Sequence, residues 1–174
     1  MAGAPPGPVV TRLRPVRDDE ADLVASWRRR PTSEFDDFDG PPPRGVTAGP
    51  RTPPPGYGEL MVTDGADTPL GTVGWHVVLT GPGPGNTALN IGISLRPEAR
   101  GRGHGARAQR LLADYLFATT TVHRVEAGTD VDNVAEQRAL TAAGFSREGV
   151  LRGAQWRRGC YHDMVGYSRL RGDG

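Results

Sequence analysis

The stretch Arg100-Gly101-Arg102-Gly103-His104-Gly105-Ala106 decides the fold of this chain, because of the segments on either side of it. Residues 87–95 alternate apolar with small or polar side chains, and this period of two predicts a strand. Apolar side chains at helical spacing follow the stretch and predict a helix through about residue 118: Ala108, Leu111, Leu112, Tyr115 and Leu116. A strand, a glycine-rich turn and a helix N-terminus form an anion site, since the N–H groups of the first helical turn lack partners.

We predict that residues 100–106 bind a pyrophosphate. Glycines allow the backbone to approach phosphate closely, and the side chains of Arg100, Arg102 and His104 add donors suited to phosphate oxygens. A glycine-rich turn with solvated arginines is the alternative without a ligand.

A dinucleotide-binding loop is a second alternative. Gly101-x-Gly103-x-x-Ala106 fits the pattern G-x-G-x-x-G/A, and an acid, Glu126, follows at about the 20 residues that the pattern expects. Residues 96–100, however, separate the strand from the first glycine. Little chain remains after Glu126 to complete a doubly wound sheet, so this alternative is the weaker one.

Composition limits the class of protein. The chain has 174 residues, enough for one domain with a sizeable core. Its single cysteine, Cys160, excludes an internal disulfide, and the lack of an 18-residue apolar run argues against a membrane span. Residues 1–8 do not resemble a secretory signal, so we expect a cytoplasmic protein. The net charge of +1 gives no reason to expect a nucleic-acid partner, and the absence of lysine excludes lysine-based catalysis.

The rest of the chain alternates between strand and helix patterns. Further strands are expected over residues 9–16, 59–63, 70–79, 122–128, 145–156 and 161–169. Helices are expected from Asp18 or Asp19 to about Arg29, and over residues 133–143 with Gly144 as the stop. This order favours one domain over residues 1–174, with a mixed central sheet and helices on both faces.

Two segments are expected to lie outside this framework. Residues 1–8 are expected to form a flexible tail. Residues 40–58, rich in proline and glycine, are expected to form a long loop. This loop is interpreted either as plain surface or as a lid over a substrate site.

Two motifs resemble the GNAT acyltransferase superfamily. Arg100-x-x-Gly103-x-Gly105 matches its R/Q-x-x-G-x-G/A signature. The segment Asn133-Val134-Ala135-Glu136-Gln137-Arg138-Ala139-Leu140-Thr141-Ala142-Ala143-Gly144-Phe145 is similar to the N-x-x-S-x-R…G-F element of the RimJ/RimL-like branch, which acetylates protein N-termini and small amines. The resemblance extends over roughly residues 8–171. It implies an α/β fold in which a central mixed, splayed β-sheet is flanked by helices on both faces.

The resemblance also implies acetyl-CoA or another acyl-CoA as the acyl donor, and no metal. Its pyrophosphate would lie on the backbone of residues 101–106, and its pantetheine would run along the preceding strand and contact Asn133. The donor-binding residues are then Ile93, Ser94, Leu95, Arg100, Gly101, Arg102, Gly103, His104, Gly105, Ala106 and Asn133. Gly92 indicates a β-bulge that would turn an N–H of this strand toward the thioester carbonyl, or else a small residue that accommodates a neighbour.

The general base is the first catalytic role to assign. Where relatives often carry a glutamate, this chain has Asn90, which can hold a water or orient the substrate but cannot accept a proton. His76 is a candidate because imidazole suits proton transfer at neutral pH, although a structural histidine is the alternative. Glu59 and the Asp36/Asp37 pair are further candidates.

The general acid is the second role. Many relatives place a tyrosine where this chain has Leu140, and the RimJ/RimL-like branch has a serine where this chain has Glu136. Glu136 is therefore a candidate acid with a raised pKa, or a base. Asn133-x-x-Glu136 also fits a capping box, in which each side chain accepts a hydrogen bond from the other residue's backbone.

The expected function is transfer of an acetyl or other acyl group from a CoA thioester to a primary amine of a small molecule or a protein N-terminus. Acidic residues at 34, 36, 37 and 39 would attract a cationic amine, or else form a solvated face. A carrier-protein-bound pantetheine, met by Arg96, Arg100 and Arg102, is an alternative donor. A non-catalytic acyl-CoA-binding module is a further alternative, and a homodimer could form through exposed strand edges.

Overall fold

The computed structural model describes residues 9–29, 32–38, 56–83 and 85–173 of the chain. The expected tail at residues 1–8 and most of the expected loop at 40–58 lie outside these residues. Seven strands form one mixed sheet in the order β1-β2-β3-β4-β5-β7-β6. Only β4 and β5 run parallel, and the other neighbours are antiparallel.

The strands and helices have the following bounds. The strands are β1 (Arg12–Arg14), β2 (Gly58–Thr63), β3 (Pro69–Leu79), β4 (Thr87–Leu95), β5 (Arg124–Asp130), β6 (Ser146–Arg157) and β7 (Cys160–Leu170). The helices are α1 (Ala21–Arg28), α2 (His104–Thr119) and α3 (Val134–Ala142), with short 3-10 turns η1 (Asp18–Glu20) and η2 (Pro97–Ala99). All the expected strands and helices are present, but α1 begins at Ala21, after the turn η1, and neither Asp18 nor Asp19 caps it. The first strand is shorter than expected because only Arg12–Arg14 pair with β2.

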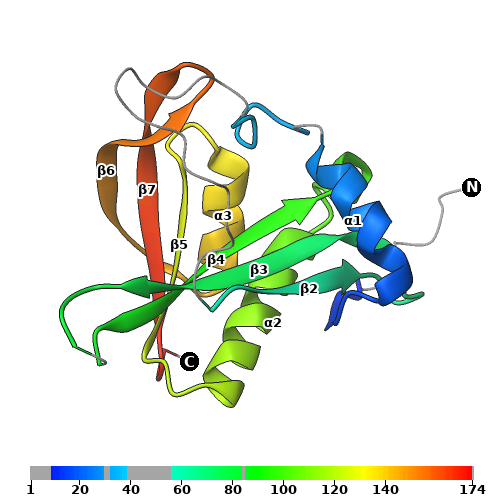
Figure 1. Ribbon diagram of the computed structural model, residues 1–174, viewed down its shortest axis with the longest axis horizontal. Coiled ribbons are helices and arrows are strands. Elements are labelled where there is room, and N and C mark those ends of the chain that lie inside the picture. Colours follow the sequence, from blue (N-terminus) through cyan, green and yellow to red (C-terminus); the bar gives the residue numbers. More distant parts are fainter. Residues whose placement is uncertain (1–8, 30–31, 39–55, 84, 174) are drawn as a thin grey trace, which may run out of the picture.

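The sheet splays apart between β4 and β5. These strands pair only where Leu89–Ile91 lie beside Val125–Ala127, and beyond that point they separate (Figure 1). The sheet therefore has two arms, one of β1–β4 and one of β5, β7 and β6. The expectation of a mixed, splayed sheet is confirmed.

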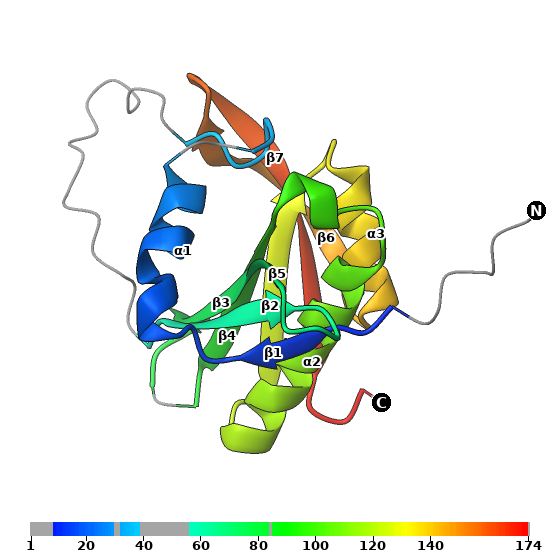
Figure 2. The same cartoon turned by 90° about the vertical axis from the view of Figure 1, so that its right-hand side faces the viewer.

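Helices cover both faces of the first arm, as expected. Figure 2 shows α1 on one face of β2–β4 and α2 on the other, with α3 beside α2. The core lies on the α2 face, where Leu89 and Ile91 of β4 pack with Leu112 and Leu116 of α2. The alternation of β4 turns Asn90, Gly92 and Ser94 toward the α1 face, so one strand contributes to the core and to the surface beneath α1. Within the described residues, no helix has both the length and the hydrophobicity needed to span a bilayer.

Candidate functional site

The glycine-rich loop leads directly into α2. Gly101 and Gly103 have positive φ angles, +70° and +83°, a backbone conformation that glycine adopts without steric cost. The helix begins its hydrogen bonding with the Arg107 N–H, which donates to the Gly103 carbonyl at 3.3 Å. The N–H groups of residues 104–106 consequently have no acceptor within the helix. Together with the positive end of the helix dipole, these three donors can bind an anion.

Two side chains of this loop have protein partners. Arg100 donates from Nε to the Leu95 carbonyl at 3.0 Å and from its terminal nitrogens to Thr32. The buried ring of His104 lies with Nδ1 at 2.9 Å from the hydroxyl of Thr11. Burial and the charge of Arg107 lower the pKa of His104, so this ring is uncharged at neutral pH. His104 can therefore offer an anion its backbone N–H rather than its ring, whereas the side chain of Arg100 and its backbone N–H, which donates to the Pro97 carbonyl at 3.2 Å, both have protein acceptors.

Arg102 and His104 border a cavity away from the contacts of Arg100. This cavity of about 630 Å³ lies between the start of α2 and the turn that joins β2 to β3. The residues around this cavity are Val9, Val10, Asp64, Gly65, Ala66, Arg102 and His104. Arg102 is exposed there.

The predicted bulge in β4 is wrong. β3 and β4 pair without interruption from Gly71 and Leu95 to Leu79 and Thr87, with Gly92 directly opposite Gly74. The edge of β4 that faces β5 is nevertheless unpaired within the sheet from Gly92 to Leu95, because the two arms separate there. The splay, rather than a bulge, leaves alternate backbone groups of this segment available to a ligand. Ile93, Ser94 and Leu95, predicted to contact the donor, all lie on this segment.

A cavity of about 300 Å³ lies between α1 and the sheet. Its floor has little side-chain bulk because Gly74 and Gly92 face each other across β3 and β4. A Cβ atom built at Gly92 would have no neighbour within 4 Å. The residues that line the cavity are Arg28, Tyr57, Glu59, Thr72, Gly74, Trp75, His76, Asn90, Gly92, Ile93 and Ser94. Two predicted catalytic residues, His76 and Asn90, are thus brought together here, with the alternative base Glu59.

Arg28 and Glu59 are the oppositely charged side chains of this cavity. The guanidinium of Arg28 forms an ion pair with Glu59 and donates to the Tyr57 hydroxyl at 3.3 Å. The hydrogen bond to Glu59 raises the pKa of Arg28, while burial and the Glu59 charge raise the pKa of Tyr57. Arg28 was not predicted as a site residue. Its position four residues after the buried Val24, on the same helical face, is the signal that could have found it.

Glu136 lies apart from this cavity, on α3 and close to α2. Asn133 caps α3, because its Oδ1 accepts a hydrogen bond from the Glu136 N–H at 3.2 Å. The N–H of Asn133 donates to the Asp130 carbonyl, so the capping box is not completed and that half of the prediction is wrong. Burial raises the pKa of Glu136 to about 7, against a smaller opposing effect of a hydrogen bond from Gln109.

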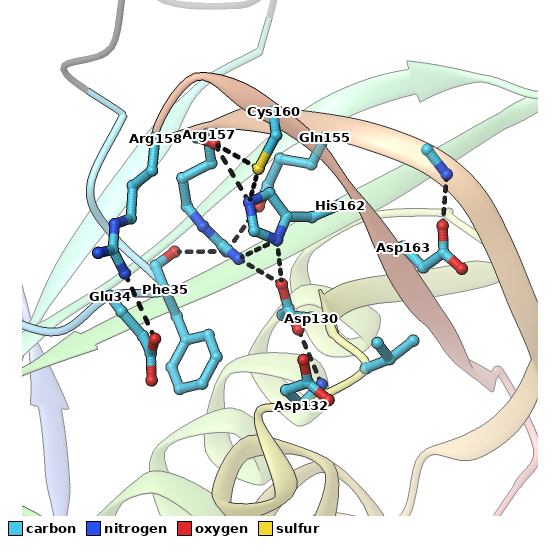
Figure 3. Close-up of polar contacts among 12 residues, drawn as sticks. Glu34, Phe35, Asp130, Asp132, Gln155, Arg157, Arg158, Cys160, His162 and Asp163 are labelled. Atoms are coloured by element: carbon cyan, nitrogen blue, oxygen red, sulfur yellow. Dashed lines mark hydrogen bonds and ion pairs between the residues drawn. The ribbon is translucent and has the colours of Figure 1, made fainter.

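A polar cluster supports the hairpin between β6 and β7 (Figure 3). Arg157 and Asp130 form an ion pair, and their side chains are only 3% and 2% exposed. Nη2 of Arg157 also lies 3.0 Å from Nδ1 of His162, and Nε2 of His162 lies 3.2 Å from the Cys160 thiol. Burial raises the pKa of Asp130, whereas the hydrogen bond from the Asp132 N–H and the Arg157 guanidinium lower it. The lowering effects together are larger, so the pKa of Asp130 is below its usual range. This carboxylate is charged.

The segment of residues 32–38 joins the two arms of the sheet. At one end, Thr32 accepts hydrogen bonds from Arg100, which follows β4. Farther along, the Phe35 carbonyl accepts from Arg157 at 3.3 Å, on the other arm. Figure 1 shows this blue segment between α1 and the β6–β7 hairpin.

The acidic residues of this segment have intramolecular partners. Glu34 forms an ion pair with Arg158, with oxygen and nitrogen 3.4 Å apart. Asp36 accepts hydrogen bonds from the backbone and hydroxyl groups of Thr32 and Ser33. Asp39 lies outside the described residues. The expected attraction for a cationic amine therefore competes with these existing contacts.

Comparison with known proteins identifies sequence relatives. The family model described as an acetyltransferase (GNAT) domain matches residues 11–146. The chain is 35% identical over 96 residues to the probable N-acetyltransferase YjcK of Bacillus subtilis (strain 168), which covers 55% of this chain and 50% of that protein. It is 26% identical over 111 residues to the uncharacterized N-acetyltransferase p20 of Bacillus licheniformis, covering 64% and 60% respectively. The chain thus spans half to three fifths of the length of these curated relatives.

Solved structures share the fold over nearly the whole chain. Mycobacterium smegmatis RimJ in complex with CoA-disulfide matches with a TM-score of 0.73 at 17% identity, covering 96% of this chain and 87% of that one. Spermidine N-acetyltransferase from Vibrio cholerae, in complex with CoA and spermine, matches with a TM-score of 0.69 at 16% identity, covering 94% and 96%. At these identities the likeness concerns the fold. Because the family model matches most of the chain, this protein belongs to the GNAT acetyltransferase family.

Proposed function

We propose that this protein transfers an acetyl or other acyl group from CoA to a primary amine, as in the RimJ/RimL-like branch of the family. The observation that carries the proposal is the position of the free N–H groups at the start of α2. The turn η2 and the glycine-rich loop return the chain from the end of β4 to this point, and a Cβ atom built at Gly105 would lie 3.8 Å from Leu95 Cδ1, in the part of β4 that has separated from β5. An anion site and an unpaired strand edge are thus adjacent, as an extended thioester with a pyrophosphate at one end requires.

The donor fits the residues present. The backbone of Gly101–Ala106 would bind the pyrophosphate, and the unpaired edge at Ile93–Leu95 would bind the pantetheine. Asn133 would add a contact from the start of α3. Acyl-CoA supplies a thioester, whose carbonyl oxygen gains negative charge during attack. A backbone N–H of the unpaired β4 segment would donate to that oxygen.

The amine would enter from the cavity beneath α1. Attack forms the N–C bond of an amide and breaks the C–S bond, so the amine must lose a proton and the CoA thiolate must gain one. His76 and Asn90 line the cavity next to Gly92, where the thioester would lie. In this proposal His76 accepts the proton of the amine, and Asn90 orients the amine or a water.

Glu136 is suited to the proton transfer to the thiolate. Its pKa of about 7 lies below the ordinary thiol value of ~8.5, so transfer of its proton to the thiolate is favourable. It is carried by α3, which lies beside α2, whereas His76 lines the cavity beneath α1, the helix on the other face of the sheet (Figure 2). The proposed acid and base would therefore act from the two faces of the splay, with the thioester between them.

Calorimetric titration with acetyl-CoA, CoA and NAD in separate experiments tests the donor. We expect micromolar binding of acetyl-CoA and CoA and none of NAD. Purified protein with acetyl-CoA and a panel of amines should then release CoA thiol. Binding without release to any amine would favour an acyl-CoA-binding module. If the protein does not bind CoA or acetyl-CoA but accepts an acyl group from an acylated carrier protein, then the donor is the carrier protein and not CoA.

A further inference from the structure

The cavity beneath α1 contains one cationic and one anionic side chain in direct contact, Arg28 and Glu59. We infer that the acceptor is a zwitterionic amine, an α-amino acid or a compound with the same spacing of amine and carboxylate. Arg28 would bind the carboxylate and Glu59 would bind the amine. This inference rests on the proposed acyl transfer and specifies its substrate class.

Arg28 has donors to spare for a carboxylate. Its two hydrogen bonds, to Glu59 and Tyr57, both leave from Nη2. Nε and Nη1 have no partner among the residues that the structure describes. A guanidinium presents its donors as a planar fork that matches the two oxygens of a carboxylate. The Arg28 side chain is 57% exposed, so a ligand can reach it without displacement of a packed element.

Glu59 is the matching group for the amine. Its side chain is only 18% exposed, and it lies directly opposite Gly74 on the neighbouring strand. Gly74 in turn lies opposite Gly92, the residue next to which the thioester is proposed to lie. An amine held by Glu59 would therefore rest over the glycine floor, between Arg28 and the unpaired β4 edge.

The charge spacing selects for a zwitterion. The amine and carboxylate of an α-amino acid are separated by a single carbon, so they require a cation and an anion in contact, as Arg28 and Glu59 are. A polyamine requires several anions instead. The cavity offers one carboxylate with a cation beside it, and at about 300 Å³ it is at the small end of ligand sites.

The inference is tested with pairs of substrates that differ only in the carboxylate. We would measure CoA release with several α-amino acids, each compared with its own carboxamide, and with spermidine. We expect kcat/KM at least about tenfold higher for the acid than for its amide. Arg28→Gln should lower kcat/KM about 10- to 100-fold for the acids and change it little for the amides. Arg29→Gln is the matched control, because it removes the same charge from an exposed neighbour that does not line the cavity.

The outcomes separate the two proposals. Equal rates for acids and amides, or an Arg28→Gln variant as active as the control on both, would overturn the zwitterion while transfer to amines stands. If none of the tested amines gives CoA release, the proposed function is overturned. Calorimetry with the CoA-saturated protein tests the inference without turnover. The inference is supported if the wild type binds the amino acids but not the amides, and if Arg28→Gln loses the binding of the amino acids. Binding of neither would refute it.

Discussion

His76 and Asn90 are direct cross-strand neighbours, paired on β3 and β4 with both residues lining the cavity beneath α1. Neighbours of this kind have Cβ atoms about 5 Å apart, close enough to contact a single substrate atom between them. The pair therefore combines a side chain that can accept a proton with one that can only orient. This division of roles distinguishes His76 from Asn90 experimentally.

His76→Ala should change the pH dependence of the rate, whereas Asn90→Ala should change its magnitude only. A histidine base gives a rate that rises with pH and levels off above about 6.5. Without that base, the rate should rise log-linearly past pH 8 with the fraction of unprotonated amine. The measurement is kcat/KM from pH 5.5 to 9 for both variants. A His76→Ala profile identical in shape to the wild type would remove His76 from the base role.

Gly105→Val should weaken donor binding without unfolding the protein. A Cβ at this position would meet only ordinary contacts, Leu95 Cδ1 at 3.8 Å and Ala139 Cβ at 3.9 Å. A branched side chain in the first turn of α2 would instead obstruct the approach of phosphate to the N–H groups. We expect at least about a tenfold loss of acetyl-CoA affinity by calorimetry.

Gly149→Val supplies the matched control for this experiment. Gly149 lies on β6, where an added Cβ would have no neighbour within 4 Å, and it is remote from the donor loop. Its variant should bind acetyl-CoA as the wild type does. Undiminished affinity in Gly105→Val would mean that the pyrophosphate lies elsewhere.

Local patterns predicted most of the fold. The period of two over residues 87–95 and the helical spacing after the loop are direct consequences of which face is buried, and both elements have nearly the predicted bounds. Gly144, predicted as a helix stop, has a φ of +92° just after α3. Such features depend on residues that are close in sequence, so the sequence alone contains them.

The site was predicted less completely because its polar partners are distant in sequence. Arg28 meets Glu59 and Arg157 meets Asp130 only after the chain has folded, and no local period marks either pair. Gly92 shows a different limit of the sequence, a local feature with more than one structural meaning. A glycine within a strand predicts either a bulge or a small residue that accommodates a neighbour; the structure has no bulge, and Gly92 leaves the floor of a cavity open opposite Gly74.

Asp130→Asn should be strongly destabilising. It removes the negative charge from the buried ion pair and leaves the Arg157 guanidinium uncompensated in the interior. Breaking a buried pair in this way typically costs about 3–5 kcal/mol of unfolding free energy. Urea denaturation of the variant measures the loss. The double variant Asp130→Asn/Arg157→Met should recover much of it, since no buried charge remains, and a double variant no more stable than the single one would contradict this explanation.

Glu136→Gln should stabilise the protein at high pH and leave its stability unchanged at low pH. The pKa of Glu136 is about 7 in the folded protein and 4.5 in its ordinary state, so the unfolded chain loses this proton first as pH rises. The free energy of unfolding should therefore fall between pH 4.5 and 7 because of this group, by up to about 3 kcal/mol before solvent screening reduces the effect. Glutamine has the same shape and no charge to bury.

Urea denaturation at pH 4, 6 and 8 should show the free energy of unfolding of Glu136→Gln increasing relative to that of the wild type as pH rises, whereas the control Glu98→Gln, at an exposed glutamate, should show no such trend. A constant difference between Glu136→Gln and the wild type at all three values would mean that Glu136 ionises normally, and it would withdraw the basis for its role as the acid.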